Sequence, residues 1–254
     1  MATQMISADA IQDGLVQGEF FLEYLPTISL ADGRCVGAEA LARWRRPSGV
    51  LQPSEFIPFV EGTHLAGMLT YWVLETVSAE LGDWLRAHEE LKIGINVPPE
   101  VLGRGGLEHA ATKTGVSEIR KQIILEITER GVPDSLGIAA LEGASRSGVR
   151  IALDDVTLSA THLVILSRST LDLIKTDKSL VDQITPDCPS PAWLSGLSSL
   201  LQSTRATVVA EGVETEAQAN ALRAAGVTMA QGFYFSPPIS AGELKAYYSR
   251  MRSV

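Results

Sequence analysis

The sequence predicts an α/β fold in which short buried strands alternate with amphipathic helices. Eight apolar runs of β-type composition are separated by longer stretches with helical spacing. Parallel strand pairing is expected, because a helix between two strands returns the chain to the same end of the sheet. A length of 254 residues also suits a single closed α/β barrel. We therefore expect one domain over residues 1–254, with a core from about 8 to 252 and no separate sensor domain within this sequence.

The individual elements follow from local patterns along the chain. The expected strands are Phe20–Leu25, Arg34–Ala40, Leu91–Val97, Gln122–Thr128, Arg150–Leu153, Leu171–Ile174, Thr207–Ala210 and a weaker one at Val227–Ala230. The clearest helix is Ala66–Ala87, where apolar residues recur at spacings of three and four. Further helices are expected at Leu136–Ser147, Pro191–Ser203, Glu216–Ala225 and Ala241–Met251. Turns are expected at Ser48–Gly49 and Gly103–Gly106.

Composition and charge exclude several classes of protein. The net charge of −9 argues against a surface that neutralises the phosphates of a DNA or RNA polymer. Cys35 and Cys188 form no CxxC pair and are expected as free thiols. The sequence has neither a signal peptide pattern at its N-terminus nor an apolar run long enough for a membrane span. These features predict a cytoplasmic protein with no membrane association.

Polar side chains suited to metal binding or proton transfer follow the apolar runs. They are Glu39, Asn96, Glu126, Asp154, Asp155, Lys175 and Glu211. In a barrel, the C-terminal ends of the strands meet at one face, so these side chains should converge. Any one of them alone could be a structural residue, but five carboxylates that converge with only one lysine repel each other unless further cations are present. An all-oxygen ligand set favours Mg²⁺ or Mn²⁺ over zinc.

Eight motifs in a consistent order carry a family resemblance over essentially the whole chain. They are EALARW (Glu39–Trp44), FIP (Phe56–Pro58) with Glu61, the strand end at Asn96, LEITE (Leu125–Glu129), ALDD (Ala152–Asp155), IKTDKSLV (Ile174–Val181), AEGVET (Ala210–Thr215) and QGFYFSPP (Gln231–Pro238). With these segments the sequence resembles the EAL domain family, bacterial phosphodiesterases that open cyclic di-GMP to linear 5′-pGpG. The resemblance implies a modified TIM (β/α)8 barrel whose first strand is antiparallel, with two Mg²⁺ or Mn²⁺ ions at its open face.

The resemblance also implies a role for each matching residue. The ligands of the first ion would be Glu39, Asn96, Glu126 and Asp154. Asp155 would help hold the second ion, and Glu211 would bind metal and orient the attacking water. Lys175 would bond to that water or to the scissile phosphate. The residues in contact with substrate would be Arg43, Leu41, Pro58, Gln231 and Glu214.

Three of these residues also have structural interpretations. Arg43 could pack against Trp44 at the surface, and Gln231 could cap a loop at a strand end. Glu214 could be the first-turn carboxylate of the helix that starts near Thr215. For Arg43 we favour the functional role, and for the other two both interpretations stay open.

The chain departs from the family pattern around the motif that contains Asp155. The family's FGTGYSSL loop corresponds to residues 156–163, where Thr157 and Ser159 replace two glycines. A β-branched residue reaches positive φ only at a cost, so we expect this loop to take a different path. Leu25 replaces the glutamine of the family's YQP, and Pro98–Pro99 follow Asn96.

Three functions follow from this pattern. The leading hypothesis is an active cyclic di-GMP phosphodiesterase with a reduced rate. The alternatives are a receptor that binds cyclic di-GMP without cleaving it, and a protein-interaction module that has lost the ligand. Family dimers use the region after Asp155, so a homodimer is implied and a monomer is the alternative.

Overall fold

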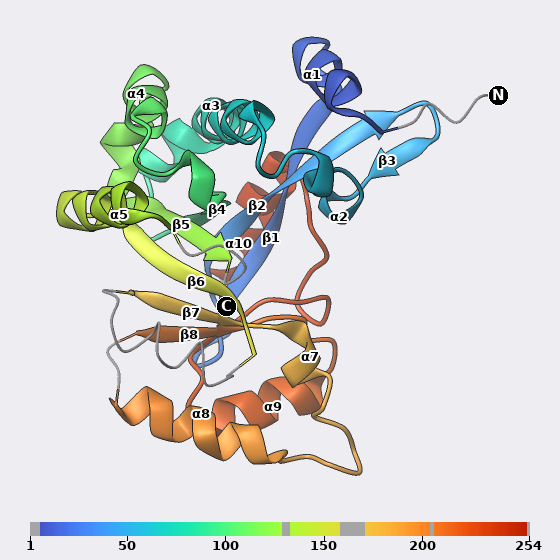
Figure 1. Cartoon of the computed structure of the whole chain (residues 1–254). Helices are drawn as coiled ribbons and strands as arrows, with labels where there is room; N and C mark the ends of the chain where they lie inside the picture. The colour runs from blue at the N-terminus through green and yellow to red at the C-terminus, as the bar shows by residue number, and fades with distance from the viewer. Residues whose placement is uncertain (1–5, 129–132, 158–170, 204–205, 253–254) are drawn as a thin grey trace.

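The fold is a barrel of eight strands with helices on its outside (Figure 1). The computed structural model describes residues 6–128, 133–157, 171–203 and 206–252. The strand order is β1-β9-β8-β7-β6-β5-β4-β2, and a pairing between β1 and β2 closes the ring. β1 is antiparallel to both of its neighbours, whereas the remaining neighbours around the ring pair in parallel. This confirms the predicted α/β barrel and its antiparallel first strand.

All eight expected strands are present. They are β1 (Phe20–Ser29), β2 (Cys35–Arg46), β4 (Lys92–Asn96), β5 (Ile123–Thr128), β6 (Arg150–Val156), β7 (Leu173–Thr176), β8 (Thr207–Ala210) and β9 (Met229–Ala230). β2 is longer than predicted because it continues past the ring in an antiparallel hairpin with β1, whereas β1 is longer at its other end, where Ile28 and Ser29 pair with β9. A short strand not predicted from the sequence, β3 (Gly49–Leu51), pairs with the far end of β2 after a turn at Pro47–Ser48.

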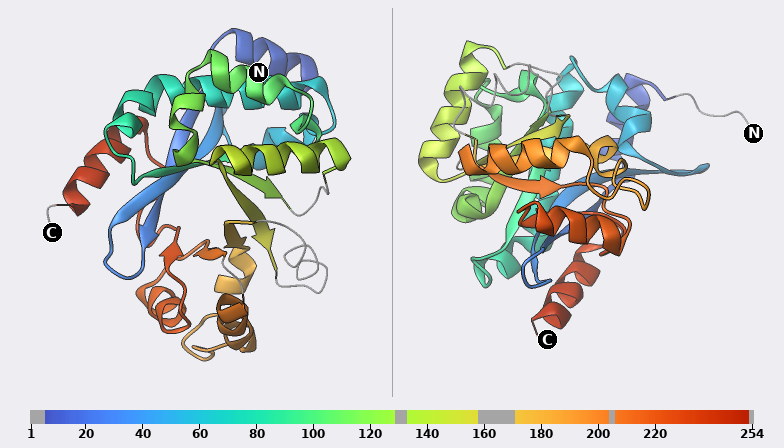
Figure 2. Two further views of the ribbon diagram at one scale, coloured as in Figure 1. Left: turned by 90° about the vertical axis from the view of Figure 1, so that its left-hand side faces the viewer. Right: turned by 90° about the horizontal axis from the view of Figure 1, so that it is seen from below.

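Helices follow most of the strands and cover the outside of the barrel (Figure 2). The five predicted helices lie within two residues of their expected ends: α3 (His64–Arg86), α5 (Ser135–Ser147), α8 (Ala192–Ser203), α9 (Glu216–Ala224) and α10 (Ala241–Met251). Among the described residues, four shorter α-helices were not predicted: α1 (Ala8–Val16), α2 (Pro53–Phe56), α4 (Gly106–Lys113) and α7 (Lys178–Val181). Elements of four to nine residues are too short to show a clear helical period. α4 begins at Gly106, inside the segment expected as a turn.

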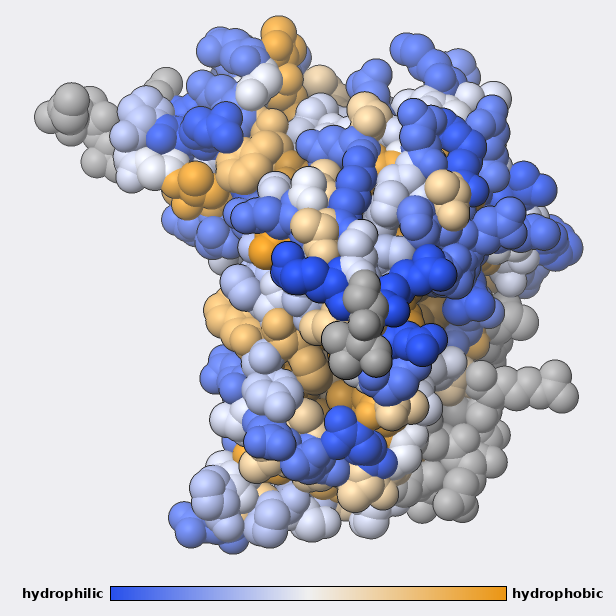
Figure 3. Space-filling model, turned by 180° about the vertical axis from the view of Figure 1, so that it is seen from behind, coloured by the Kyte–Doolittle hydropathy of each residue, from blue (hydrophilic) through white to orange (hydrophobic). Residues whose placement is uncertain are grey.

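The main hydrophobic core lies between the strands and the helices. α3 buries one face, with Leu69, Val73 and Val77 at helical spacing. At the end of the β1–β2 hairpin, the rings of Phe20 and Trp44 stack with their centroids 5.1 Å apart. On the face opposite to the view of Figure 1, hydrophilic side chains surround scattered hydrophobic ones (Figure 3). In the described part of the chain, no helix has the length and hydrophobicity that crossing a membrane requires.

Candidate metal centre

Glu39 lies in the middle of β2 rather than at its end, which corrects the prediction from the sequence. β2 pairs with β4 only from Gly37 to Ala40 and then leaves the ring with β1 and β3. Glu39 is therefore near the last position of β2 that still faces the neighbouring parallel strands. Its side chain is 9% exposed. The antiparallel extension of β2, which lengthens the apparent strand, is the reason for the difference.

Asp154 and Asp155 both reach the site because β6 contains a bulge. Consecutive residues of a regular strand point to opposite faces. The pairing of β6 with β7 shifts between Leu153 and Val156, so that β6 carries one extra residue there. Asp155 has a φ of 57°, a conformation that aspartate tolerates better than most residues. Its backbone N–H donates to Asp154 Oδ1 at 2.9 Å. The bulge thus turns two adjacent carboxylates to the same side, where an oxygen of each lies within 4.8 Å of the other and of a Glu211 oxygen.

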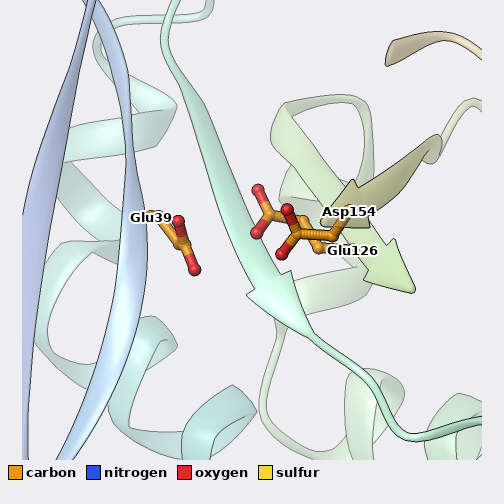
Figure 4. A group of neighbouring side chains, drawn as sticks. All are labelled: Glu39, Glu126 and Asp154. Carbon is orange, nitrogen blue, oxygen red and sulfur yellow. The ribbon is translucent and has the colours of Figure 1, made fainter. Parts of the chain in front are cut away.

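Three buried carboxylates face one another at the mouth of the barrel. Glu39 points inward from β2, and Glu126 and Asp154 point toward it from β5 and β6, with β4 between them (Figure 4). Lys175 reaches into this group from β7. Its Nζ lies 2.8 Å from Glu39 Oε2 and 2.7 Å from Glu126 Oε2. It also lies 3.4 Å from Asp154 Oδ2 and 2.6 Å from Glu211 Oε1.

One lysine cannot satisfy four carboxylates. An ammonium group has three N–H donors, and those of Lys175 are directed at Glu39, Glu126 and Asp154. The buried Oε1 of Glu211 lies close to Nζ but accepts no hydrogen bond from the described residues. Its described contact is the ion pair with Nζ at 2.6 Å, and a buried carboxylate oxygen that accepts no hydrogen bond is costly. The cluster therefore has unused acceptor capacity that a cation would fill.

The pKa values reflect this shortage of positive charge. Burial raises the pKa of Glu126 well above its usual value, and the charge of Glu39 adds to the effect. Burial also raises the pKa of Asp154 and that of Glu211, the latter to about 8. For Glu39, burial again raises the pKa, but the charge of Lys175 and the hydrogen bonds with Lys175, Asn96 and Glu126 together outweigh burial, and the pKa falls. Burial disfavours the ammonium of Lys175, yet the surrounding carboxylates raise its pKa.

The oxygen donors form two sets that share one residue. Oxygens of Glu39, Glu126 and Asp154 lie within 4.8 Å of one another, as do those of Asp154, Asp155 and Glu211. Asn96 donates its amide N–H to Glu39 Oε1 at 2.8 Å, which leaves its carbonyl oxygen available. The donors in the two sets are oxygens, which are the preferred ligands of Mg²⁺ and Mn²⁺. The residues fit hard divalent cations, and Asp154 belongs to both sets.

Gly94 leaves space for the side chain of Glu126 because it has no side chain of its own. The sequence did not reveal this role of Gly94. A Cβ atom at position 94 would lie 2.0 Å from Glu126 Oε1 and 2.7 Å from its Cδ. Gly94→Ala is therefore expected to displace the buried carboxylate and weaken Mn²⁺ binding about tenfold or more, the range seen when residues that orient metal ligands are changed. Isothermal calorimetry measures this. Gly196→Ala is the matched control, because a Cβ there meets nothing within 4 Å. Equal Mn²⁺ affinity in the two variants would contradict the steric argument.

The raised pKa of Glu211 predicts a pH dependence of stability in the metal-free protein. In the folded state the pKa is about 8, compared with a usual value of 4.5, so the folded protein binds more protons between these values. The stabilising contribution of the protonated group is therefore lost as pH rises from about 4.5 to 8. We expect metal-free protein to melt at a lower temperature at pH 8.5 than at pH 6, and Mn²⁺ to raise the melting temperature more at pH 8.5. A Glu211→Gln variant should show a smaller pH dependence. An unchanged dependence in that variant would assign the effect to other groups.

A cleft of about 830 Å³ opens beside the carboxylates. Its inner wall includes Glu39, Asn96 and Asp155, and it extends over Leu41 and Pro58. This volume is typical of sites for small organic ligands, which range over roughly 300–1,000 Å³. Leu41 and Pro58, two of the residues predicted to contact substrate, thus line the same cleft as Glu39, Asn96 and Asp155 of the predicted metal ligands.

The remaining predicted substrate residues lie around this centre without joining it. The Nε of Arg43 donates to Glu23 Oε2 at 2.7 Å, and Arg43 is not part of the cleft wall. Gln231 is buried, donates to Thr27 Oγ1 at 2.8 Å, and has an Oε1 with no described partner. Glu214 is half-exposed and pairs with Lys178 at the surface. Their roles toward a substrate stay predictions.

Most of the segment in which the chain departs from the family pattern lies outside the described residues. Within residues 156–163, only Val156 and Thr157 are described, with Val156 buried at the end of β6. The expected change in the path of this loop therefore remains a prediction.

Proteins of similar sequence are longer than this chain. An uncharacterized protein of Mycobacterium tuberculosis, Rv1354c, is 35% identical over 250 residues, which cover 95% of this chain and 40% of that protein. The probable cyclic di-GMP phosphodiesterase PdeB of Escherichia coli is 34% identical over 236 residues, covering 89% of this chain and 44% of PdeB. The chain thus spans less than half the length of these relatives.

Solved structures and a family model agree on the classification. The structure of the EAL enzyme Bd1971 bound to cAMP and cyclic di-GMP matches with a TM-score of 0.85 and 27% identity, over 94% of this chain and 67% of that one. The PaMucR phosphodiesterase in complex with c-di-GMP matches with a TM-score of 0.82 and 29% identity, over 93% and 98% of the two chains. The model of the EAL domain matches residues 8–238. The chain belongs to the EAL domain family.

Proposed function

We propose that this domain is a divalent-metal phosphodiesterase that hydrolyses cyclic di-GMP to linear 5′-pGpG. The observation that carries the proposal is the pair of oxygen sets that share Asp154, next to a cleft that fits a small organic ligand. The names of the relative PdeB and of the PaMucR structure supply the substrate and the reaction. A protein-interaction module without ligand would have no use for clustered carboxylates, because their mutual repulsion disfavours the charged forms.

The ion sites would divide the carboxylates between them. The first ion would be held by Glu39, Asn96, Glu126 and Asp154, and the second by Asp154, Asp155 and Glu211. Two bound Mg²⁺ or Mn²⁺ ions would supply Lewis acid activation of water and stabilise the charge of the attacking and leaving oxygens. The chain's own residues would orient the reactants: Glu211 would accept a proton from the attacking water, and Lys175 would donate to a phosphate oxygen.

Lys175 suits this role because of its surroundings. Its raised pKa keeps the ammonium charged at neutral pH, and it is 2% exposed, so its charge acts in a poorly solvated site. Ions bound to the carboxylates would compete for the oxygens that Lys175 now contacts. The N–H groups released in this way become available to an anionic substrate.

Location and assembly follow from the sequence and the family rather than from the site. We infer a cytoplasmic protein, supported by two cysteines that are both free thiols. We infer a homodimer from the family resemblance alone, through the region after Asp155. A sedimentation measurement of the purified chain at micromolar concentration distinguishes the dimer from the monomer.

A hydrolysis assay tests the proposed function. Purified protein with Mn²⁺ or Mg²⁺ is incubated with cyclic di-GMP, and products are separated by chromatography. We expect pGpG from the wild type and at most a trace from Glu39→Ala, which removes a ligand of the proposed first ion. Equal product from both proteins would mean that a contaminant is responsible. Calorimetric binding of cyclic di-GMP without any product would instead identify a receptor.

A further inference from the structure

One ion pair in the β1–β2 hairpin lies beside the proposed substrate cleft. In the antiparallel register, Glu23 is opposite Leu41, and Phe21 is opposite Arg43. Residues opposite each other, and every second residue along a strand, point to the same face. Glu23 and Arg43 therefore share the face of the hairpin that carries Glu39 and Leu41. Because β1 is antiparallel to β2, the first residues of β1 lie beside the last residues of β2. Glu23 therefore lies beside the part of β2 that follows Glu39.

The guanidinium of Arg43 is held by two acceptors from the protein. Its Nε donates to Glu23 Oε2 at 2.7 Å, and its Nη1 donates to the backbone oxygen of Ala42 at 3.0 Å. The side chain of Arg43 is 5% exposed, whereas that of Glu23 is 32% exposed. An anion that approaches Arg43 from the cleft therefore meets the half-open carboxylate of Glu23 as well. The positive charge of Arg43 is already neutralised before any ligand binds.

Away from Lys175 and the proposed ion sites, the cleft offers little positive charge to an anionic ligand among its described lining residues. Its walls include five acidic residues and one basic residue, Arg104, whose guanidinium pairs with Asp134 at 2.7 Å. Glu39 and Arg43 are four residues apart on one strand, roughly 13 Å at the usual rise per residue. A ligand that extends from the carboxylates toward Arg43 passes over Leu41, directly across from Glu23. Glu23 thus lies beside the guanidinium of Arg43, where a ligand phosphate that contacts Arg43 would bind.

We propose that Glu23 limits the affinity of the site for its phosphodiester ligand by competing with the ligand phosphate for Arg43. The proposal rests on the proposed function, because it takes cyclic di-GMP as the ligand. A negative charge held within several ångströms of a bound phosphate costs binding energy by repulsion, and it also neutralises the cation that the phosphate needs. Removing only the charge of Glu23 should therefore tighten binding.

The test is a cycle of two substitutions measured with cyclic di-GMP as the probe. Glu23→Gln keeps the size of the side chain and an acceptor for Arg43 Nε, so the buried guanidinium stays partnered. We expect KM to fall about threefold to tenfold, with kcat within twofold of the wild type. In an Arg43→Ala background, the same substitution should change KM by less than about twofold, because the contested cation is absent.

Asp83→Asn is the matched control for charge removal. Asp83 is exposed on α3, lies outside the cleft wall and pairs with Arg86 at 2.6 Å. We expect its KM to stay within about twofold of the wild type, because the pair is exposed and screened. A fall in KM equal to that of Glu23→Gln would attribute the effect to net charge and overturn the proposal. An increase in KM for Glu23→Gln would overturn it too, since that sign belongs to a residue that orients Arg43.

Failure of the proposed function gives a different result from failure of this inference. Turnover by the wild type with an unchanged KM in Glu23→Gln rejects the inference alone. Absence of turnover in the wild type rejects the phosphodiesterase, and the same four proteins are then compared by calorimetric Kd for cyclic di-GMP. A lower Kd for Glu23→Gln that depends on Arg43 supports the competition, and absence of binding in every protein rejects both proposals. Melting curves of all variants establish that each one is folded.

Discussion

Lys175→Ala is expected to lower the turnover of cyclic di-GMP on the order of 10²–10³-fold, the usual effect of losing one donor to a reacting oxyanion. The substitution removes the ammonium that contacts four carboxylates in the metal-free site. Without metal, the loss of one partner from a buried ion pair costs roughly 3–5 kcal/mol, so the melting temperature should fall. With saturating Mn²⁺, most of that loss should be recovered, because the ions replace the missing charge. Initial rates and melting curves with and without Mn²⁺ measure both effects.

Lys178→Ala is the matched control for the lysine substitution. Lys178 is three residues further along the chain, half-exposed, and pairs with Asp182 and Glu214 at the surface. We expect its rate to stay within about threefold of the wild type. Its melting temperature should change little, because an exposed ion pair contributes little to stability. If Lys175→Ala lost as much stability with Mn²⁺ as without it, Lys175 would be a structural residue rather than a catalytic one.

Glu211→Gln is the second substitution with a large expected effect. The amide keeps the shape of the side chain but removes a charged ligand oxygen and the acceptor for a proton, so turnover should fall about 10²-fold or more. In the metal-free protein at pH 8.5, the substitution should raise stability. It removes a buried carboxyl group that has a pKa of about 8 and would be ionised at this pH. The measurements are the initial rate with saturating Mn²⁺ and the melting temperature without metal. A lower melting temperature together with full activity would contradict both parts.

The sequence predicted the barrel because each level of its pattern agrees with the fold. The apolar runs that became β4, β5 and β8 are short and bounded by polar residues, which leaves little choice of register. The helices α3 and α5 have N-caps, Thr63 and Asp134, which lie within three residues before the predicted starts. The ends of β1 and β2 were predicted less well, since antiparallel pairing extends them beyond the point where the apolar pattern stops.

The predicted metal ligands come together, but their geometry could not be predicted from residue types. Periodicity places Asp154 and Asp155 on opposite faces of β6, and only the bulge and the positive φ of Asp155 bring them to one side. Gly94 has no chemistry of its own, and its importance lies in the space that Glu126 occupies. Glu23 and Arg43 are 20 residues apart in the chain and meet through the hairpin register. Each of these features depends on pairing between strands.

The number of ions needed for turnover is the most direct test of the shared carboxylate site. Mn²⁺ is titrated into metal-free protein that holds cyclic di-GMP, and bound ions and released pGpG are measured in the same samples. Because Asp154 belongs to both oxygen sets, we predict that pGpG forms only as the second equivalent of Mn²⁺ binds. Full activity at one bound equivalent, or no pGpG at two, would contradict the proposed two-ion phosphodiesterase.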